Sequence, residues 1–172
     1  EILIRAAARL TDTRVLIVGG GEHQGRLTRL VRELGLSDRV SLLGHQTAAQ
    51  VTALLASCDI YCLPSLERTE AFGLVLLEAM RFARPVVVSD IPGSGAPWLV
   101  RQAGNGCLVA PGDAVALAEA LAALQADALK RQYLGEAGAR VFKRDFVIGP
   151  VATAIQGLYQ RVLTEYSGPS RF

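Results

Sequence analysis

The sequence predicts an α/β fold, a Rossmann-like, doubly wound parallel sheet with helices on both faces. Short runs rich in Val, Ile and Leu alternate with longer stretches in which apolar residues recur every three or four positions, which is the pattern of βαβ units. Glycine- or proline-containing turns follow most of these runs. In such sheets ligands bind beyond the carboxyl ends of the strands. The loops that follow the strands are therefore where we expect a site.

Five short apolar runs are predicted as strands, at 15–18, 40–43, 60–63, 86–88 and 107–109. Each is rich in β-branched or leucine residues, and a glycine or proline turn stops each of the first three. The loops after the first four strands, which follow Val18, Leu43, Leu63 and Val88, would then share the carboxyl edge of the sheet.

Helical periodicity fills the segments between and after these strands. It predicts helices at 26–34, 47–58, 72–82, 114–124, 128–141 and from 150 onward, and the same spacing occurs in 1–10. Thr47 and Gln50 have the spacing of a capping box, and Asp113 is a good N-cap for the helix that follows it. The glycine- and proline-rich segment 91–97 is predicted as a loop.

The composition is that of one soluble globular domain. The chain has 172 residues, 51% apolar and 20% charged, and 18 Lys and Arg against 16 Asp and Glu give a net charge of +2. These values exclude intrinsic disorder and collagen-like chains. The near-neutral charge gives no reason to expect nucleic acid or an anionic membrane as the main partner. No apolar run reaches the ~20 residues of a transmembrane segment, and no secretory signal is visible.

The cysteines and the first residues of the chain bear on its location. Cys58, Cys62 and Cys107 lack metal-ligand spacing and lie in apolar runs, which is typical of buried, reduced thiols in a cytoplasmic protein. No Asp-x-Asp sequence occurs and the two histidines are scattered, so no metal site is predicted. The chain opens on a helical pattern with no Met before it, and we expect it to be a piece of a longer protein.

The strongest functional pattern is the apolar helix predicted at 72–82. Glu78 is the only acidic residue within it, and a helix this apolar is expected to be buried on most sides, so the carboxylate needs a partner. One interpretation is an ion pair with Arg81 or a hydrogen bond to a neighbouring loop. The other is that Glu78 faces a ligand cleft and accepts hydrogen bonds from sugar hydroxyls.

A second acidic residue, Glu70, precedes the same helix. If the helix extends that far, the two α-carbons lie about 12 Å apart, which is comparable to the distance between the hexose and the ribose of a nucleotide sugar. Backbone N–H groups at Phe72, Gly73 and Leu74 would lie at the helix N-terminus between the two acids, where the helix dipole favours an anion. One helix would then hold all three parts of a nucleotide sugar.

The sequence Glu-Ala-Phe-Gly-Leu-Val-Leu-Leu-Glu at 70–78 resembles the E-x7-E motif of retaining GT-B glycosyltransferases of family 4, the glycosyl transferases group 1. The similarity covers nearly the whole chain. It includes 16–21, 39–44, 84–90 and 106–113. It implies the C-terminal half of a GT-B fold, with residues 1–172 forming a nucleotide-sugar-binding domain truncated at its N-terminus. The segment 92–98 is similar to mannosyl- and rhamnosyltransferase-like members that build surface polysaccharides.

The resemblance implies a role for each matching residue. Glu70 would be the catalytic residue, contacting the transferred hexose and stabilising its developing positive charge, and Glu78 would bind the ribose hydroxyls. The other predicted donor contacts are main-chain and loop positions: Phe72, Gly73 and Leu74 beside the hexose and diphosphate, His45 and Gln46 near the base, and Gly20 and Gly21 near the donor cleft.

The same resemblance implies an activity and partners. The chain would be the donor-binding part of a hexosyltransferase. That enzyme would move a hexose from a nucleotide sugar, such as GDP-mannose or a UDP-sugar, to a glycan or lipid-linked acceptor. The anomeric configuration would be retained and no metal cofactor used. Family members bind the acceptor through an N-terminal domain that is absent from this chain. We therefore expect the isolated chain to be inactive, and its parent to be cytoplasmic with a loose association at the inner face of the membrane.

Family members also place a basic pair, Arg and Lys, before the first helix of this domain to neutralise the diphosphate. The chain lacks that segment, and Arg68 does not match the motif.

Two other functions remain open at this point. The spacing of Gly19, Gly21 and Gly25 after a strand suggests an NAD(P)-binding Rossmann domain, but the next strand ends without the Asp or Glu that such domains place on the ribose. A non-catalytic nucleotide-sugar-binding module is the second alternative, and the presence of both Glu70 and Glu78 argues against it.

Overall fold

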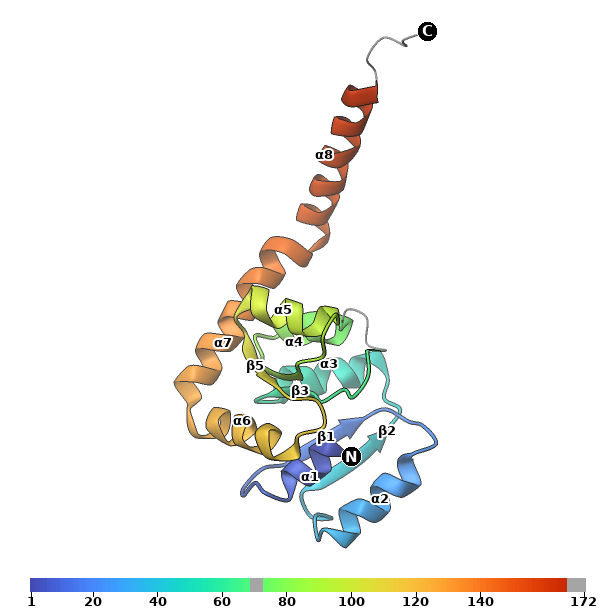
Figure 1. Ribbon diagram of the computed structural model, residues 1–172, viewed down its shortest axis with the longest axis vertical. Helices are drawn as coiled ribbons and strands as arrows, with labels where there is room; N and C mark the ends of the chain where they lie inside the picture. Colours follow the sequence, from blue (N-terminus) through green and yellow to red (C-terminus); the bar gives the residue numbers. More distant parts are fainter. Residues whose placement is uncertain (69–72, 167–172) are drawn as a thin grey trace.

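The computed structural model describes residues 1–68 and 73–166, which alternate between strands and helices (Figure 1). The strands are β1 (Val15–Val18), β2 (Val40–Gly44), β3 (Tyr61–Leu63), β4 (Val86–Ser89) and β5 (Gly106–Val109). The helices are α1 (Ile2–Ala7), α2 (Gln24–Glu33), α3 (Ala48–Ser57), α4 (Leu74–Arg81), α5 (Gly95–Ala103), α6 (Ala114–Ala126), α7 (Ala128–Val141), the short π-helix η1 (Phe142–Phe146) and α8 (Ile148–Tyr166).

All strand pairing in the described ranges is parallel, which confirms the predicted α/β class. The strands form two sheets, one of order β1-β2 and one of order β3-β4-β5. In the second sheet Cys62, Val87 and Cys107 lie side by side. Since every strand in a sheet points the same way, the loops that follow the strands gather at one edge, here called the carboxyl edge, and those that precede them gather at the opposite, amino edge.

Helices cover both faces of the β3-β4-β5 sheet. Val86 and Val88 point into a core cluster shared with α3, α4 and α5, whereas Val87 points into a second cluster shared with α1 and α6. This alternation is what a strand buried on both faces requires. Ile4 and Ala7 of α1 belong to a third cluster with β1, β2 and α2. Because Ala6 belongs to the second cluster, α1 packs against both sheets. Helix α8 extends away from the body formed by the other elements (Figure 1).

Several predicted helix boundaries are confirmed. The Thr47 side chain accepts from the Gln50 N–H and the Gln50 side chain accepts from the Thr47 N–H, so the capping box is formed. Asp113 accepts hydrogen bonds from the first turn of α6. Gly35 has a φ of +66° just beyond α2, consistent with the predicted stop. Helix α2 starts two residues before its predicted beginning at Arg26.

The prediction of a loop over 91–97 is wrong at its end, because α5 begins inside that segment. The Ser94 side chain accepts a hydrogen bond from the Ala96 N–H and caps the helix. Pro97 falls in the first turn, where a missing N–H costs nothing because that group has no partner within the helix. Gly104 ends the helix with a φ of +59°.

The apolar helix predicted at 72–82 is shorter than expected. Helix α4 starts at Leu74, and its N-cap Gly73 has a left-handed backbone with φ of +77°. The helix therefore does not run on toward Glu70, and the 12 Å estimate, which assumed a continuous helix, does not apply. Glu70 and Phe72 lie outside the described residues.

Within the described part of the chain, no helix has both the length and the apolar composition needed to span a membrane.

Candidate functional site

Two glycine loops meet at the carboxyl edge of β1 and β2. The Gly19 N–H donates to the Gly44 carbonyl at 2.9 Å and ties the loop after β1 to the loop after β2. The His45 ring lies directly against Gly20, because a Cβ placed on Gly20 would come within 2.4 Å of the ring atoms Cδ2 and Nε2. The structure thus brings together Gly20 and His45, two residues predicted to lie at one site. The absence of a side chain at Gly20 makes the room for the ring.

Their neighbours Gly21 and Gln46 have different surroundings. Gly21 is exposed, and a Cβ there would meet nothing within 4 Å. The Gln46 side-chain amide donates to the Leu43 carbonyl at 2.7 Å. Gln46 therefore closes the turn after β2, and its NH₂ group is already engaged in part.

The start of α4 forms the next part of the candidate site. Gly73 is buried, and a Cβ there would lie 3.1 Å from Leu76 Cδ1 and 3.2 Å from Ala96 Cβ. Position 73 is thus reserved for glycine both by its positive φ and by the close approach of α5. Leu74, the first helical residue, is 68% exposed. Within this first turn the Leu76 N–H donates to the Gly73 carbonyl at 2.8 Å.

Glu78 lies one turn further along α4, about 6 Å from Leu74 along the helix axis. The expectation that this helix is buried on most sides is wrong. Leu76, Ala79 and Met80 form its buried face, and Glu78 is exposed on the opposite one. The many leucine and alanine residues suggest from composition that the whole helix is buried. Their spacing, however, leaves one face of the helix exposed to solvent.

The ion pair considered for Glu78 is not formed. In the described part of the chain no hydrogen bond or ion pair engages its carboxylate, and the Arg81 guanidinium lies over the Phe82 ring, 5.6 Å from the centroid. Of the two interpretations offered by the sequence, the local ion pair with Arg81 is therefore excluded. Among residues 1–68 and 73–166 the Glu78 carboxylate is exposed and has no partner.

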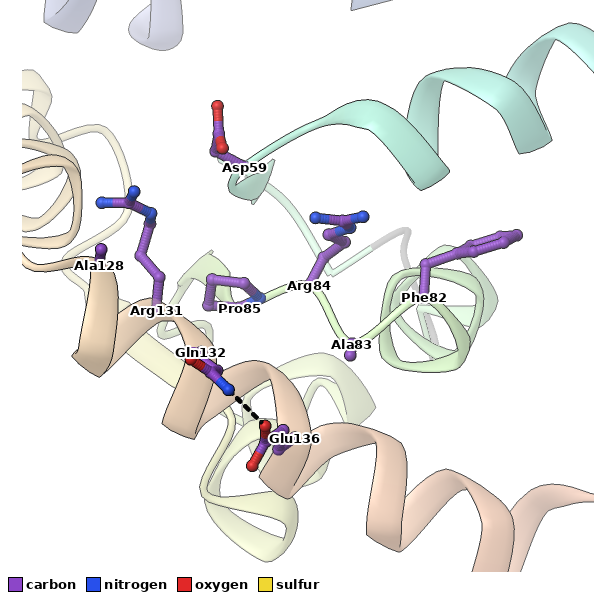
Figure 2. A pocket seen from close by; sticks show the side chains of 9 residues that line it. All are labelled: Asp59, Phe82, Ala83, Arg84, Pro85, Ala128, Arg131, Gln132 and Glu136. Atoms are coloured by element: carbon purple, nitrogen blue, oxygen red, sulfur yellow. Dashed lines mark hydrogen bonds between the residues drawn. The ribbon is translucent and has the colours of Figure 1, made fainter.

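A recess of about 330 Å³ lies at the opposite, amino edge of β3 and β4 (Figure 2). Its lining includes Asp59 before β3, Arg84 before β4, and residues of α7. Figure 2 shows Gln132 and Glu136 on one face of α7, joined by a 2.9 Å hydrogen bond.

The arginines around this recess are used by the fold. Arg84 donates to the Ala56 carbonyl at the end of α3, and Arg131 donates to the Leu124 and Gln125 carbonyls of α6 at 2.6 and 2.7 Å. Carbonyls in the last turn of a helix lack partners within it, so these arginines stabilise helix C-termini. A second recess, of about 360 Å³, is lined by Arg5 of α1, by Ala8 and Arg9 just after it, by Leu34 and by the start of α6. Neither recess contains a predicted site residue.

An ion pair that the sequence reasoning missed follows β4. Arg101 of α5 donates to both carboxylate oxygens of Asp90, at 2.7 and 2.6 Å. The two residues are eleven positions apart, outside the short spacings by which helical pairs are found in sequence.

The three cysteines are free thiols, as predicted, and each is partly rather than fully buried. Burial raises the pKa of the Cys62 thiol to about 12. Burial also raises the pKa of Cys58. These two thiols therefore stay protonated at neutral pH and are poor nucleophiles.

Comparison with known proteins identifies the family. Residues 1–141 match the family described as Glycosyl transferases group 1. The chain is 34% identical over 167 residues to the O-antigen chain mannosyltransferase C of Escherichia coli, covering 97% of this chain and 44% of that protein. It is 35% identical over 157 residues to the phosphatidyl-myo-inositol mannosyltransferase of Mycobacterium leprae (strain TN), covering 91% of this chain and 40% of that protein.

Among solved structures, Anabaena HepE in complex with UDP superposes with a TM-score of 0.80 at 29% identity, over 95% of this chain and 44% of that one. The chain thus spans less than half the length of the relatives it matches. The resemblance found in the sequence is confirmed at the level of the family and the GT-B fold. The chain belongs to the glycosyl transferases group 1 family.

Proposed function

We propose that this chain is the donor-binding part of a hexosyltransferase. It binds a nucleotide sugar at the carboxyl edge of its strands, and the parent protein transfers the hexose to an acceptor held by a second domain. The observation that carries the proposal is Glu78, an exposed carboxylate with no partner in the described residues, placed one turn from the N-terminus of α4. The mannosyltransferase relatives and the UDP complex of HepE support a nucleotide sugar as the ligand.

Each part of the candidate site has a task in this proposal. The Glu78 carboxylate accepts hydrogen bonds from both ribose hydroxyls, since its two oxygens match a vicinal diol. The N–H groups at Gly73 and Leu74 face the diphosphate, whose negative charge grows as it leaves. Gly20 and Gly21 leave room for the donor, and the His45 ring, held against Gly20, offers a face to the base.

In the proposed reaction the hexose moves from the diphosphate to the acceptor. The bond between the anomeric carbon and the diphosphate oxygen breaks, a bond to the acceptor oxygen forms on the same face of the sugar, and the acceptor proton passes to the departing phosphate. Glu70, which lies outside the described residues, contacts the hexose during this step. We propose family 4 membership, retention of configuration and catalysis without a metal. GDP-mannose is the first donor to test, and a surface glycan or lipid-linked glycan is the acceptor class.

We propose a cytoplasmic location for the parent protein. The parent acts in the cytoplasm, loosely held at the inner face of the membrane by parts outside this chain. Without the acceptor-binding domain, the chain alone binds donor and does not transfer it.

The experiment is a titration of the chain with GDP, UDP, GDP-mannose and UDP-glucose, followed by NMR, for the wild type and for Glu78→Gln. The variant keeps the shape of the side chain but loses the charged acceptor. We expect at least about tenfold weaker binding, because a hydrogen bond to a charged group contributes about 1.5 to 3 kcal/mol.

The matched control is Glu119→Gln, which removes another exposed carboxylate, from α6, and makes the same change of net charge. It should bind as the wild type does. Equal binding by Glu78→Gln and Glu119→Gln would contradict the role given to Glu78. Transfer is then tested in the parent protein with and without Glu70→Gln, and an unchanged rate would contradict a catalytic role for Glu70.

A further inference from the structure

The carboxyl edge carries one arginine that the proposed function does not yet use. Arg68 follows β3 by five residues, and its guanidinium lies against Gly93 in the loop after β4. A Cβ placed on Gly93 would lie 3.2 Å from the Arg68 Cζ, 3.3 Å from Nη1 and 3.4 Å from Nε. Because three atoms of the guanidinium are almost equally distant, its flat face packs on the glycine. Its N–H groups lie in that plane and point past the glycine.

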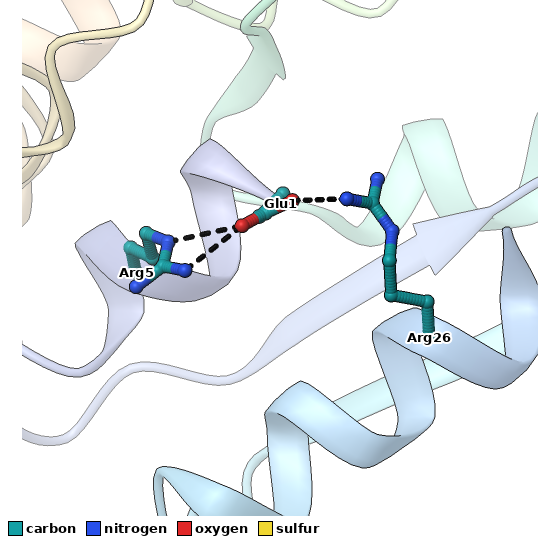
Figure 3. Close-up of polar contacts among 3 residues, drawn as sticks. All are labelled: Glu1, Arg5 and Arg26. Atoms are coloured by element: carbon teal, nitrogen blue, oxygen red, sulfur yellow. Dashed lines mark hydrogen bonds and ion pairs between the residues drawn. The ribbon is translucent and has the colours of Figure 1, made fainter.

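Several other basic side chains are engaged by carboxylates. Glu1 accepts from Arg5 and from Arg26 at 2.9 and 2.8 Å (Figure 3), and Asp90 holds Arg101. Arg68 has no ion pair within residues 1–68 and 73–166, and its sequence neighbour Glu67 forms none with it. Arg68 is therefore an exposed guanidinium that packs on Gly93 and forms no ion pair or side-chain hydrogen bond among the described residues.

The loop that holds Arg68 leads directly to the start of α4. Gly93 immediately precedes Ser94, the N-cap of α5, and Ala96 in the first turn of α5 touches Gly73. Three residues of chain between Gly93 and Ala96 reach no more than about 11 Å. Arg68 thus stands near the N-terminus of α4, at which the proposed function places the diphosphate.

We propose that Arg68 binds the diphosphate of the donor, an inference that rests on the proposed function. A planar guanidinium can bind two phosphate oxygens side by side, which suits a diphosphate better than a single hydroxyl or a base. Contact with Gly93 restricts the exposed guanidinium before the ligand arrives, so part of the side-chain freedom is already lost before binding. Arg68 supplies positive charge from within this domain, independent of any basic pair elsewhere in a longer protein.

The test compares nucleoside diphosphates with monophosphates. The chain and its Arg68→Ala, Arg68→Lys and Arg29→Ala variants are titrated with UDP, UMP, GDP and GMP by NMR. The solution holds about 0.15 M salt, at which charges beyond about 8 Å are largely screened. Arg29 lies exposed on α2 and makes no ion pair in the described residues, so Arg29→Ala controls for the loss of one positive charge. Matching amide spectra of wild type and Arg68→Ala show that the fold is kept.

For Arg68→Ala we expect about tenfold weaker binding of the diphosphates, with the monophosphates bound as by the wild type, because the charge-assisted hydrogen bonds to the β-phosphate are lost. Arg68→Lys should lie between the two, since an ammonium keeps the charge but not the paired geometry. Arg29→Ala should bind all four nucleotides like the wild type.

Two results overturn the inference while leaving the proposed function intact. In one, the wild type binds diphosphates and Arg68→Ala binds them equally well. In the other, Arg68→Ala loses diphosphates and monophosphates to the same extent, which indicates a contact away from the β-phosphate. A wild-type chain that binds none of the four nucleotides overturns the proposed donor-binding function itself, and the inference with it.

Discussion

Charged side chains at the two edges of the strands differ in whether they have partners within the fold. At the amino edge Arg39, Arg84 and Arg131 all donate to backbone carbonyls, at the ends of α1, α3 and α6. At the carboxyl edge Glu78 and Arg68 have no partner among the described residues. In βα units the helix C-termini gather at the amino edge, where unpaired carbonyls attract cations, and the N-termini gather at the carboxyl edge. Arginines thus cap helix C-termini at the amino edge. At the carboxyl edge Asp90 and Arg101 pair with each other, whereas Glu78 and Arg68 form no ion pair among the described residues.

The largest effect expected from this contrast is a pair of glycine substitutions. A Cβ on Gly135 of α7 would lie 1.9 Å from the Ala83 carbonyl oxygen at the amino edge, so backbone must move. We expect Gly135→Ala to lower the free energy of unfolding by about 3 kcal/mol or more. A Cβ on Gly21 at the carboxyl edge meets nothing. Gly21→Ala should change stability by less than about 0.5 kcal/mol. Urea unfolding measures both, and similar losses would refute the contrast.

The next effect concerns the arginines themselves. Arg39 Nη1 donates to the Ala7 and Leu10 carbonyls at 2.9 and 2.8 Å, in a partly buried position. Its replacement by Ala leaves both carbonyls without this donor, and we expect stability to fall by about 2 kcal/mol. Arg68→Ala, at the other edge, should leave the unfolding midpoint close to that of the wild type. Denaturant titration of the two variants side by side would show an inverted order if the assignment of the edges were wrong.

The smallest expected effect lies midway between the edges, at Cys62 in β3. The folded thiol has a pKa of about 12, against an ordinary value of 9.0. Above pH 9 the unfolded chain releases a proton that the folded chain keeps, so stability must fall as pH rises. By pH 10 this loss is about 1 kcal/mol. Cys62→Val removes it, and its stability should decline less steeply between pH 9 and pH 10 in thermal unfolding. Parallel curves for the two proteins would show that Cys62 is not the source.

Much of the fold could be predicted because its signals are local. The capping box at Thr47 and Gln50 involves residues three apart, and the valines of β4 form a run that only a doubly covered strand tolerates. Helix α5 is absent from the predicted helices because Gly95 and Pro97 favour turns in isolation, whereas one cap at Ser94 suffices for a helix to begin.

The candidate site was predicted in its residue types but not in its contacts. Glu78 and His45 could be singled out from motif and loop position. The packing of His45 on Gly20, and of Arg68 on Gly93, joins loops from different strands, and no spacing along the sequence records it. The exposure of Glu78 depended on which face of α4 meets the core. That choice is made by tertiary packing, so an apolar sequence alone suggested burial.

The left-handed backbone of Gly73 has a consequence for recognition. Leu76 and Ala96 lie close to Gly73, and this packing restricts the backbone at the start of α4. The amide hydrogens there need no rearrangement when an anion arrives, and the entropy of aligning them has been lost beforehand. A site built in this way selects its ligand by how well the ligand fits the preformed backbone at the start of α4.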